Sequence, residues 1–123
     1  MKKTFTILIV DDDPEIGIML KIMLEHKGFS VIVLNNAEKL SETLSTHTID
    51  VIILDMLIAG LNGTEISAIL KKNPATSQYP IMIMTAMPDA ELICRQSGAN
   101  EFIAKPFEMD NFIAKINSLT VHL

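Results

Sequence analysis

Three consecutive aspartates, Asp11, Asp12 and Asp13, follow directly after the apolar run ILIV near the start of the chain. Two carboxylates about 4 Å apart repel each other by roughly 4 kcal/mol at the effective dielectric of a protein surface. Because folded domains are only marginally stable, such a cluster needs a compensating positive charge. A set of oxygen ligands with few carboxylates favours Mg²⁺, which keeps several of its waters. The stretch therefore predicts a magnesium site, with Asp11 and Asp12 as candidate ligands, and such a cation can also accept phosphoryl oxygens.

Further polar groups follow other apolar runs in the same way. Asp55 comes after VIIL, Thr85 comes after IMIM, and Lys105 comes after the run that ends at Ala104. Phosphoryl transfer requires positioning and charge neutralisation more than covalent machinery. These residues suit it, with Asp55 as a nucleophile that forms an acyl phosphate, Lys105 as a counter-charge beside Mg²⁺, and Thr85 as a hydroxyl donor to a phosphoryl oxygen.

Each of these residues also has an ordinary structural explanation. An aspartate before a proline is most often a helix N-cap, and Asp13 before Pro14 is assigned that role. Asp55 alone is typical of a turn, and Thr85 or Lys105 alone would carry no functional meaning. The case for a site depends on whether the fold brings these groups to one place.

The elements that must position them follow from the hydrophobic pattern. Short apolar runs rich in β-branched residues alternate five times with longer amphipathic segments. The pattern predicts strands at 6–10, 30–34, 50–54, 80–84 and 101–104, and helices at 14–27, 37–45, 64–72, 88–97 and 108–119.

The runs ILIV, VIIL and IMIM are almost continuously apolar, which is typical of parallel strands covered by helices on both faces. Because crossovers between parallel strands are right-handed, the simplest architecture is a doubly wound α/β sheet of five parallel strands with five helices. Ligands of such sheets bind beyond the carboxyl ends of the strands. We therefore expect the carboxylates, Thr85 and Lys105 to meet at that edge, with the strand at 30–34 at the side of the sheet.

Composition limits the function further. A length of 123 residues with 49% hydrophobic content predicts one folded domain, and a net charge of −5 with a pI near 5.0 argues against direct binding to nucleic acid. A single cysteine, Cys94, allows no internal disulfide and favours a cytoplasmic location. The first apolar run is too short for a signal or membrane segment and ends at Asp11. We therefore expect no membrane association.

With these motifs, the chain resembles a receiver domain of the response regulators of bacterial two-component signalling. The resemblance covers essentially all of residues 1–123, from ILIVDDDPEI through LDMLIAGLNG and MTA to AKPF. It implies a flavodoxin-like fold with strand order 2-1-3-4-5. It also implies that Asp55 is the phosphoacceptor, and that Asp11, Asp12, Asp55 and the backbone carbonyl of Leu57 hold Mg²⁺.

The same resemblance implies a conformational switch. Thr85, followed by Ala86, matches the switch hydroxyl, and Lys105 matches the lysine that pairs with the phosphoryl group. Phe102 falls at the position of the switch aromatic, and Pro106 at the position of a cis proline. Phosphorylation would draw the Thr85 hydroxyl inward, admit the Phe102 ring and change the surface of the fourth helix, fifth strand and fifth helix.

The resemblance also implies partners. The phosphoryl group would come from a sensor histidine kinase, a phosphotransfer protein or a small acyl phosphate, so the domain would not be an enzyme in the usual sense. The output would pass to a downstream protein, to an effector domain of a longer regulator, or to a homodimer that forms on phosphorylation. The chain is expected to be either a free-standing receiver or the receiver part of a longer regulator.

The chain departs from the family pattern in the segment after Asp55. Ala59 stands where a proline is usual and Asn62 where an aspartate is usual, which predicts a looser loop in which Asn62 can still cap the next helix. Leu57 and Met87 occupy the family positions that flank the path of the hydrolytic water. Because both side chains are apolar, we expect slow loss of the phosphoryl group.

Three alternatives compete with this interpretation. A haloacid dehalogenase-type phosphatase would need a second acid where the chain has Leu57. A flavodoxin-like flavin carrier would need a hydroxyl- and glycine-rich loop in place of DDDPEIG. The remaining alternative is a pseudo-receiver, a protein-binding module with the same fold that works without phosphorylation. A hydroxylamine-labile adduct formed with acetyl phosphate and Mg²⁺ would distinguish a receiver from a pseudo-receiver.

Overall fold

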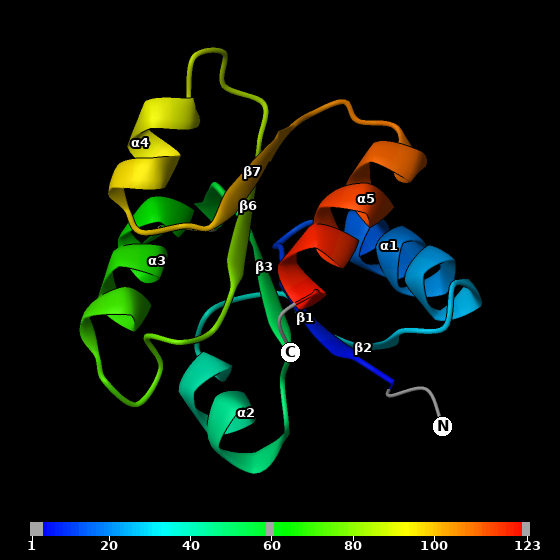
Figure 1. Ribbon diagram of the computed structural model, residues 1–123, viewed down its shortest axis with the longest axis horizontal. Coiled ribbons are helices and arrows are strands. Elements are labelled where there is room, and N and C mark those ends of the chain that lie inside the picture. Colours follow the sequence, from blue (N-terminus) through cyan, green and yellow to red (C-terminus); the bar gives the residue numbers. More distant parts are fainter. Residues whose placement is uncertain (1–3, 59–60, 122–123) are drawn as a thin grey trace.

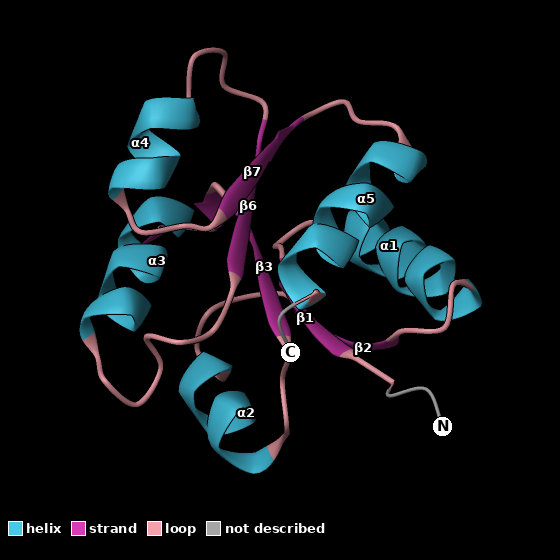
Figure 2. Ribbon diagram, in the orientation of Figure 1, coloured by secondary structure: helices cyan, strands magenta, loops and turns pink. Residues whose placement is uncertain are grey.

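The computed structural model describes residues 4–58 and 61–121 of the chain. A parallel sheet lies between two groups of helices (Figures 1 and 2). The strands of this sheet are β1 (Thr6–Val10), β2 (Ser30–Leu34), β3 (Val51–Asp55), β6 (Ile81–Thr85) and β7 (Glu101–Ala104). The helices are α1 (Pro14–His26), α2 (Leu40–Thr46), α3 (Gly63–Lys72), α4 (Glu91–Gln96) and α5 (Met109–Thr120).

The order of the strands in this sheet is β2-β1-β3-β6-β7, and every neighbouring pair is parallel. Counted along the chain within the sheet, this is the predicted order 2-1-3-4-5, with the strand Ser30–Leu34 at the side. The register aligns the carboxyl ends, because Val10 lies opposite Leu54 and Thr85 lies opposite Ala104. The predicted doubly wound α/β sheet is therefore confirmed, and its polar end residues meet at one edge.

The helices cover the two faces of the sheet separately. In Figure 1, α1 and α5 lie together on one side, and α2, α3 and α4 lie on the other. The alternation of buried strand residues explains this division, since Ile7 and Ile9 pack with Leu20 of α1 and Phe112 of α5, whereas Leu8 belongs to the opposite cluster. Residues of β3 and β6 are buried along their whole length. The strand ends are therefore held on a rigid support.

Two helices begin three residues later than the sequence pattern predicts. The helix predicted from residue 37 begins at Leu40, because the Asn36 side chain accepts a hydrogen bond from the Glu38 N–H at 3.0 Å and forms a turn. The helix predicted from residue 88 begins at Glu91, because Asp89 has a φ of 59°. This left-handed conformation cannot be part of a right-handed helix.

A short antiparallel hairpin, which the sequence did not predict, joins β3 to α3. It consists of β4 (Leu57–Ile58) and β5 (Leu61–Asn62). The Asn62 side chain accepts a hydrogen bond from the Thr64 N–H at 2.9 Å, which confirms the predicted cap of α3. Ala59, at which a looser loop was expected, lies outside the described residues.

The helices are short. The longest among the described residues, α1, has 13 residues, whereas about 20 are needed to span the hydrocarbon core of a bilayer. Within residues 4–58 and 61–121, no helix has both the length and the apolar character that a membrane crossing requires.

Candidate functional site

Three carboxylates meet at the carboxyl edge of the sheet, as the sequence predicts. Asp11 follows β1 directly, Asp12 comes next, and Asp55 is the last residue of the neighbouring strand β3. One oxygen from each of the three carboxylates lies within 4.8 Å of the others. Asp11 and Asp55 are buried and Asp12 is exposed, so the group is open to solvent from the side of Asp12.

The carboxylate of Asp11 is only half satisfied by the protein. Its Oδ1 accepts a hydrogen bond from the Asp13 N–H at 2.9 Å, whereas its Oδ2 is buried and finds no hydrogen-bond partner in the part of the chain that the structure describes. Burial raises the pKa of Asp11, the charges of Asp55 and Asp12 raise it further, and the Asp13 N–H and Lys105 oppose the shift. A buried oxygen without a partner is costly, but it is well placed as a ligand of a divalent cation. The residues present therefore fit a magnesium ion.

A lysine supplies the positive charge that the cluster requires. The Nζ of Lys105 lies 3.0 Å from Oδ1 of Asp55 and 3.8 Å from Oδ2 of Asp11. Lys105 follows β7, and the peptide bond between Lys105 and Pro106 is cis, as predicted. The Lys105 N–H also donates to the carbonyl of Thr85 at 2.6 Å, which holds the start of this loop against β6. The predicted counter-charge is therefore within ion-pair distance of two carboxylates.

Thr85, the last residue of β6, lies at the same edge and is almost fully buried. Its hydroxyl accepts a hydrogen bond from the Met87 N–H at 2.9 Å and donates to the sulfur of Met56 at 3.1 Å. Met56 is not among the residues predicted from the sequence. No sequence signal identifies it, because a buried methionine is usually core filling.

Gly63 is a second residue of the site that was not predicted from the sequence. A Cβ at this position would overlap the backbone carbonyl oxygen of Asp55 and would lie 3.1 Å from Cα of Met56. The Gly63 N–H donates to the carbonyl of Met56 at 2.7 Å. The glycine therefore allows the start of α3 to pack directly against the backbone of Asp55. The available signal was a glycine that directly follows the helix cap Asn62.

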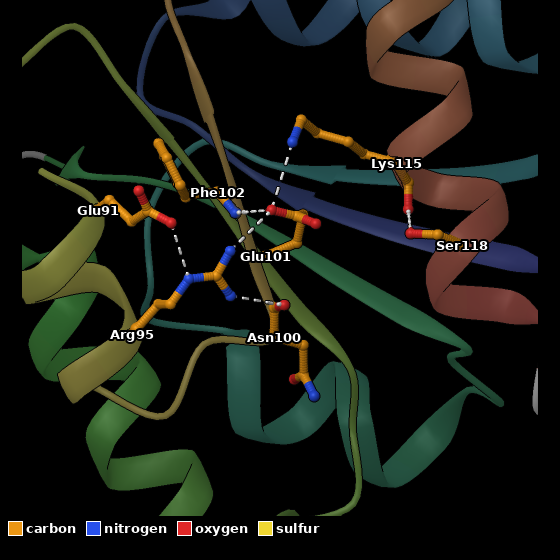
Figure 3. Close-up of polar contacts among 7 residues, drawn as sticks. All are labelled: Glu91, Arg95, Asn100, Glu101, Phe102, Lys115 and Ser118. Carbon is orange, nitrogen blue, oxygen red and sulfur yellow. Dashed lines mark hydrogen bonds and ion pairs between the residues drawn. The ribbon is translucent and has the colours of Figure 1, made fainter.

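The predicted switch aromatic, Phe102, is partly buried on β7 and lies among charged side chains from α4 and α5. The guanidinium of Arg95 and the Nζ of Lys115 each lie 5.7 Å from the centre of its ring. Figure 3 shows Glu101 between these two cations. Its Oε1 lies 3.5 Å from Nη2 of Arg95 and 3.3 Å from Nζ of Lys115, and Arg95 also pairs with Glu91 at 3.2 Å. We call Glu101, Arg95 and Lys115 the Phe102 clamp.

Comparisons with known proteins agree with this geometry. A model of the response regulator receiver domain family matches residues 7–117. The DNA-binding response regulator MtrA of Mycolicibacterium smegmatis is 31% identical over 114 residues, which cover 91% of this chain and 49% of MtrA. The chain therefore spans about half the length of the curated relatives it matches.

Solved structures agree as well. A response regulator from Chloroflexus aurantiacus, described as putative, has a TM-score of 0.90 and 30% identity, with 97% of this chain and 99% of that chain covered. The response regulator TrrA of Thermotoga maritima, in complex with Mg²⁺ and BeF, has a TM-score of 0.84 and 27% identity, with 94% and 99% covered. This chain belongs to the response regulator receiver domain family.

Proposed function

We propose that this domain accepts a phosphoryl group on Asp55, from a histidine kinase or a small acyl phosphate, in a reaction that requires Mg²⁺. The observation that carries the proposal is the buried Oδ2 of Asp11, which has no hydrogen-bond partner among the described residues and lies in a cluster with Asp12 and Asp55 near the ammonium of Lys105. The similar protein TrrA supports it, because its structure contains Mg²⁺ and BeF.

In the proposed reaction, an oxygen of the Asp55 carboxylate attacks the phosphorus atom. A new P–O bond forms, and the bond from phosphorus to the donor's imidazole nitrogen or carboxylate oxygen breaks, with its electron pair leaving on the donor. Lys105, already paired with Asp55, is placed to neutralise the phosphoryl oxygens. Asp11, Asp12, Asp55 and the carbonyl of Leu57 would hold Mg²⁺, which supplies further charge neutralisation when bound.

The test is incubation of the protein with acetyl phosphate and Mg²⁺, followed by mass spectrometry and treatment with hydroxylamine. We expect one hydroxylamine-labile phosphoryl adduct on the wild-type protein. It should not form when Mg²⁺ is chelated before the incubation, and it should be absent in Asp55→Asn. Asp50→Asn is the matched control, because Asp50 is a buried aspartate one residue before the start of β3, at the other end of the strand, where its side chain accepts from the Thr6 N–H. Absence of an adduct on the wild-type protein would favour the pseudo-receiver alternative.

Phosphorylation would then change the surface formed by α4, β7 and α5. The phosphoryl dianion would attract the hydroxyl of Thr85, and the Phe102 ring would move into the space left behind, beside Ala86. Before phosphorylation, the Phe102 clamp holds the ring near α4 and α5. The equilibrium between the two states therefore depends on the clamp.

We expect Glu101→Gln to favour the phosphorylated conformation, because it weakens the ion pairs to Arg95 and Lys115. Partly exposed pairs are each worth about 0.2–1 kcal/mol, so the affinity for beryllofluoride with Mg²⁺, a phosphoryl mimic, should rise about threefold. Isothermal titration calorimetry measures this affinity. Glu91→Gln is the matched control, since it removes one partner of Arg95 and leaves Glu101 in place. Equal affinities in wild type and Glu101→Gln would contradict the role assigned to the clamp.

Slow loss of the phosphoryl group is expected from the residues around the acceptor. Leu57 and Met87 are 73% and 54% exposed, and neither side chain can hydrogen-bond a water strongly. We expect Leu57→Asn to increase the rate of dephosphorylation several-fold, because an amide can orient an attacking water. The rate is measured by the decay of the adduct, and Leu57→Ala controls for loss of bulk. Fast decay in wild type, unchanged in Leu57→Asn, would argue against this explanation.

Receiver domains pair with histidine kinases, and we propose a histidine kinase as the partner of this chain. We take residues 1–123 as one receiver domain, and we propose that it meets its partner in the cytoplasm. The name of MtrA describes a DNA-binding regulator about twice the length of the matched region. For this chain, the proposed output is an effector domain of a longer regulator, a separate downstream protein or a phosphorylation-dependent homodimer. Testing the kinases of the host for rapid phosphotransfer would identify the donor.

A further inference from the structure

The hydroxyl of Thr85 has a hydrogen-bond partner that the proposed chemistry does not use. It donates to the sulfur of Met56 at 3.1 Å, and both residues are buried, with 1% and 3% of their surfaces exposed. The oxygen of the same hydroxyl accepts from the Met87 N–H. The hydroxyl proton of Thr85 is therefore committed to Met56 in this conformation.

We propose that Met56 is a positioning residue that holds the Thr85 hydroxyl in its resting orientation and thereby tunes how readily Asp55 accepts a phosphoryl group. The inference rests on the proposed function of Asp55 and Thr85. A hydroxyl has one proton, so Thr85 can donate either to the Met56 sulfur or to a phosphoryl oxygen. The two hydrogen bonds compete, and their difference in free energy contributes to the switching equilibrium.

The chemistry of the acceptor sets the direction of this effect. A thioether sulfur is a weak hydrogen-bond acceptor, whereas a phosphoryl oxygen is a strong, charged one. Replacing the hydrogen bond to Met56 by one to a phosphoryl oxygen therefore favours the phosphorylated state. The sulfur still stabilises the resting state, because without it the buried Thr85 hydroxyl would have no acceptor in that state, which costs free energy. Met56 therefore gives the resting state a moderate advantage that phosphorylation can overcome.

The backbone fixes the position of Met56. Its N–H donates to the carbonyl of Met84 on β6 at 2.8 Å, and its carbonyl accepts from the Gly63 N–H at 2.7 Å. These two bonds attach Met56 to the strand that carries Thr85 and to the start of α3. The Met56 side chain belongs to the core cluster against which Phe102 also packs. The sulfur is therefore held beside Thr85, within the same apolar cluster against which Phe102 packs.

The main test is Met56→Leu, which keeps the volume and removes the acceptor. We expect the affinity for beryllofluoride with Mg²⁺, measured by calorimetry, to rise about threefold, because the resting state loses a hydrogen bond that the bound state does not use. Met84→Leu is the matched control. Met84 is also buried but belongs to the cluster on the opposite face of the sheet, so Met84→Leu should bind beryllofluoride with the wild-type affinity.

A double-mutant cycle separates this role from simple packing. In a Thr85→Val background, which lacks the hydroxyl, Met56→Leu should no longer change the affinity. The ¹³C-methyl NMR signal of Met56 provides a second readout that needs no Met56 variant. It should shift when beryllofluoride binds and also in Thr85→Val without ligand. Met84, observed in the same spectra, should shift less.

The outcomes that overturn the inference are specific. An unchanged affinity in Met56→Leu, or the same increase in the Thr85→Val background, would show that the sulfur does not position the hydroxyl. A Met56 methyl signal insensitive to both beryllofluoride and Thr85→Val would overturn it equally. If wild-type protein does not bind beryllofluoride at all, the proposed function fails together with this inference. Binding by wild type without an effect of Met56→Leu overturns the inference alone.

Discussion

Gly63→Ala is expected to lower the free energy of unfolding by about 3 kcal/mol, and to reduce phosphorylation of Asp55 as well. The new Cβ would overlap the carbonyl oxygen of Asp55 and press on Cα of Met56, and both of these are backbone atoms. A flexible side chain could move away at little cost, but these are backbone atoms at the last residue of β3 and the residue directly after it, and they cannot. The start of α3 must therefore move away from the phosphoacceptor.

Urea denaturation measures the stability, and the acetyl phosphate reaction measures the acceptor. Gly28→Ala is the matched control, because Gly28 has a φ of 96° and, apart from its two chain neighbours, no described residue has an atom within 4 Å of the position that an alanine Cβ would take. That variant should lose about 1 kcal/mol from backbone strain and keep the phosphorylation rate of wild type. Equal losses of stability in the two variants, with phosphorylation intact in both, would contradict the close approach of Gly63 to Asp55.

The sequence predicted the arrangement of the sheet and most of the site because both depend on local pattern. Continuous apolar runs identify buried parallel strands, and parallel strands place their last residues at one edge. The approach of Lys105 to Asp55 at 3.0 Å follows from that rule, although 50 residues separate them. The predicted bounds of β1, β2 and β7 are those of the structure, whereas β3 and β6 each begin and end one residue later and so end at Asp55 and Thr85.

The features that the sequence did not predict depend on contacts between distant segments or on single dihedral angles. The late start of α4 follows from the left-handed conformation of Asp89, which an aspartate adopts in some contexts and not in others. The contact between Thr85 and Met56 depends on side-chain rotamers at the ends of neighbouring strands. The Phe102 clamp combines residues from α4, β7 and α5, each of which reads as an ordinary surface charge when taken alone.

Asp11→Asn is expected to have two effects of opposite sign. Loss of a carboxylate ligand should weaken Mg²⁺ binding at least about tenfold. The metal-free protein should become more stable by about 1 to 2 kcal/mol at neutral pH, because a buried charge beside two other carboxylates is removed. The amide can keep the hydrogen bond that Oδ1 accepts from the Asp13 N–H.

The direction of the pKa shift of Asp11 determines how the stability difference between wild type and Asp11→Asn changes with pH. Burial raises the pKa of Asp11 above its ordinary value of 3.8, so the folded state binds more protons than the unfolded state between the two pKa values. The free energy of unfolding contributed by this group therefore falls as the pH rises from 3.8 through the raised pKa, and the penalty is complete above it. An asparagine does not titrate. The gain in free energy of unfolding from Asp11→Asn should consequently grow as the pH rises from 3.8 through the raised pKa of Asp11, and it should remain constant at higher pH.

Asp12→Asn is the matched control, because Asp12 is exposed and belongs to the same cluster. Both variants should lose Mg²⁺ affinity, but Asp12→Asn should change the stability of the metal-free protein less, since an exposed charge is screened by solvent. Urea denaturation between pH 4 and pH 8, with and without Mg²⁺, separates the two effects. Wild type should gain about 1.4 kcal/mol when Mg²⁺ is present at ten times its dissociation constant, and Asp11→Asn, with binding at least about tenfold weaker, should gain at most about 0.4 kcal/mol at that concentration. If Asp11→Asn were less stable than wild type without metal, the buried Oδ2 of Asp11 would have to be satisfied by the protein itself, and the strongest structural argument for a magnesium site would be lost.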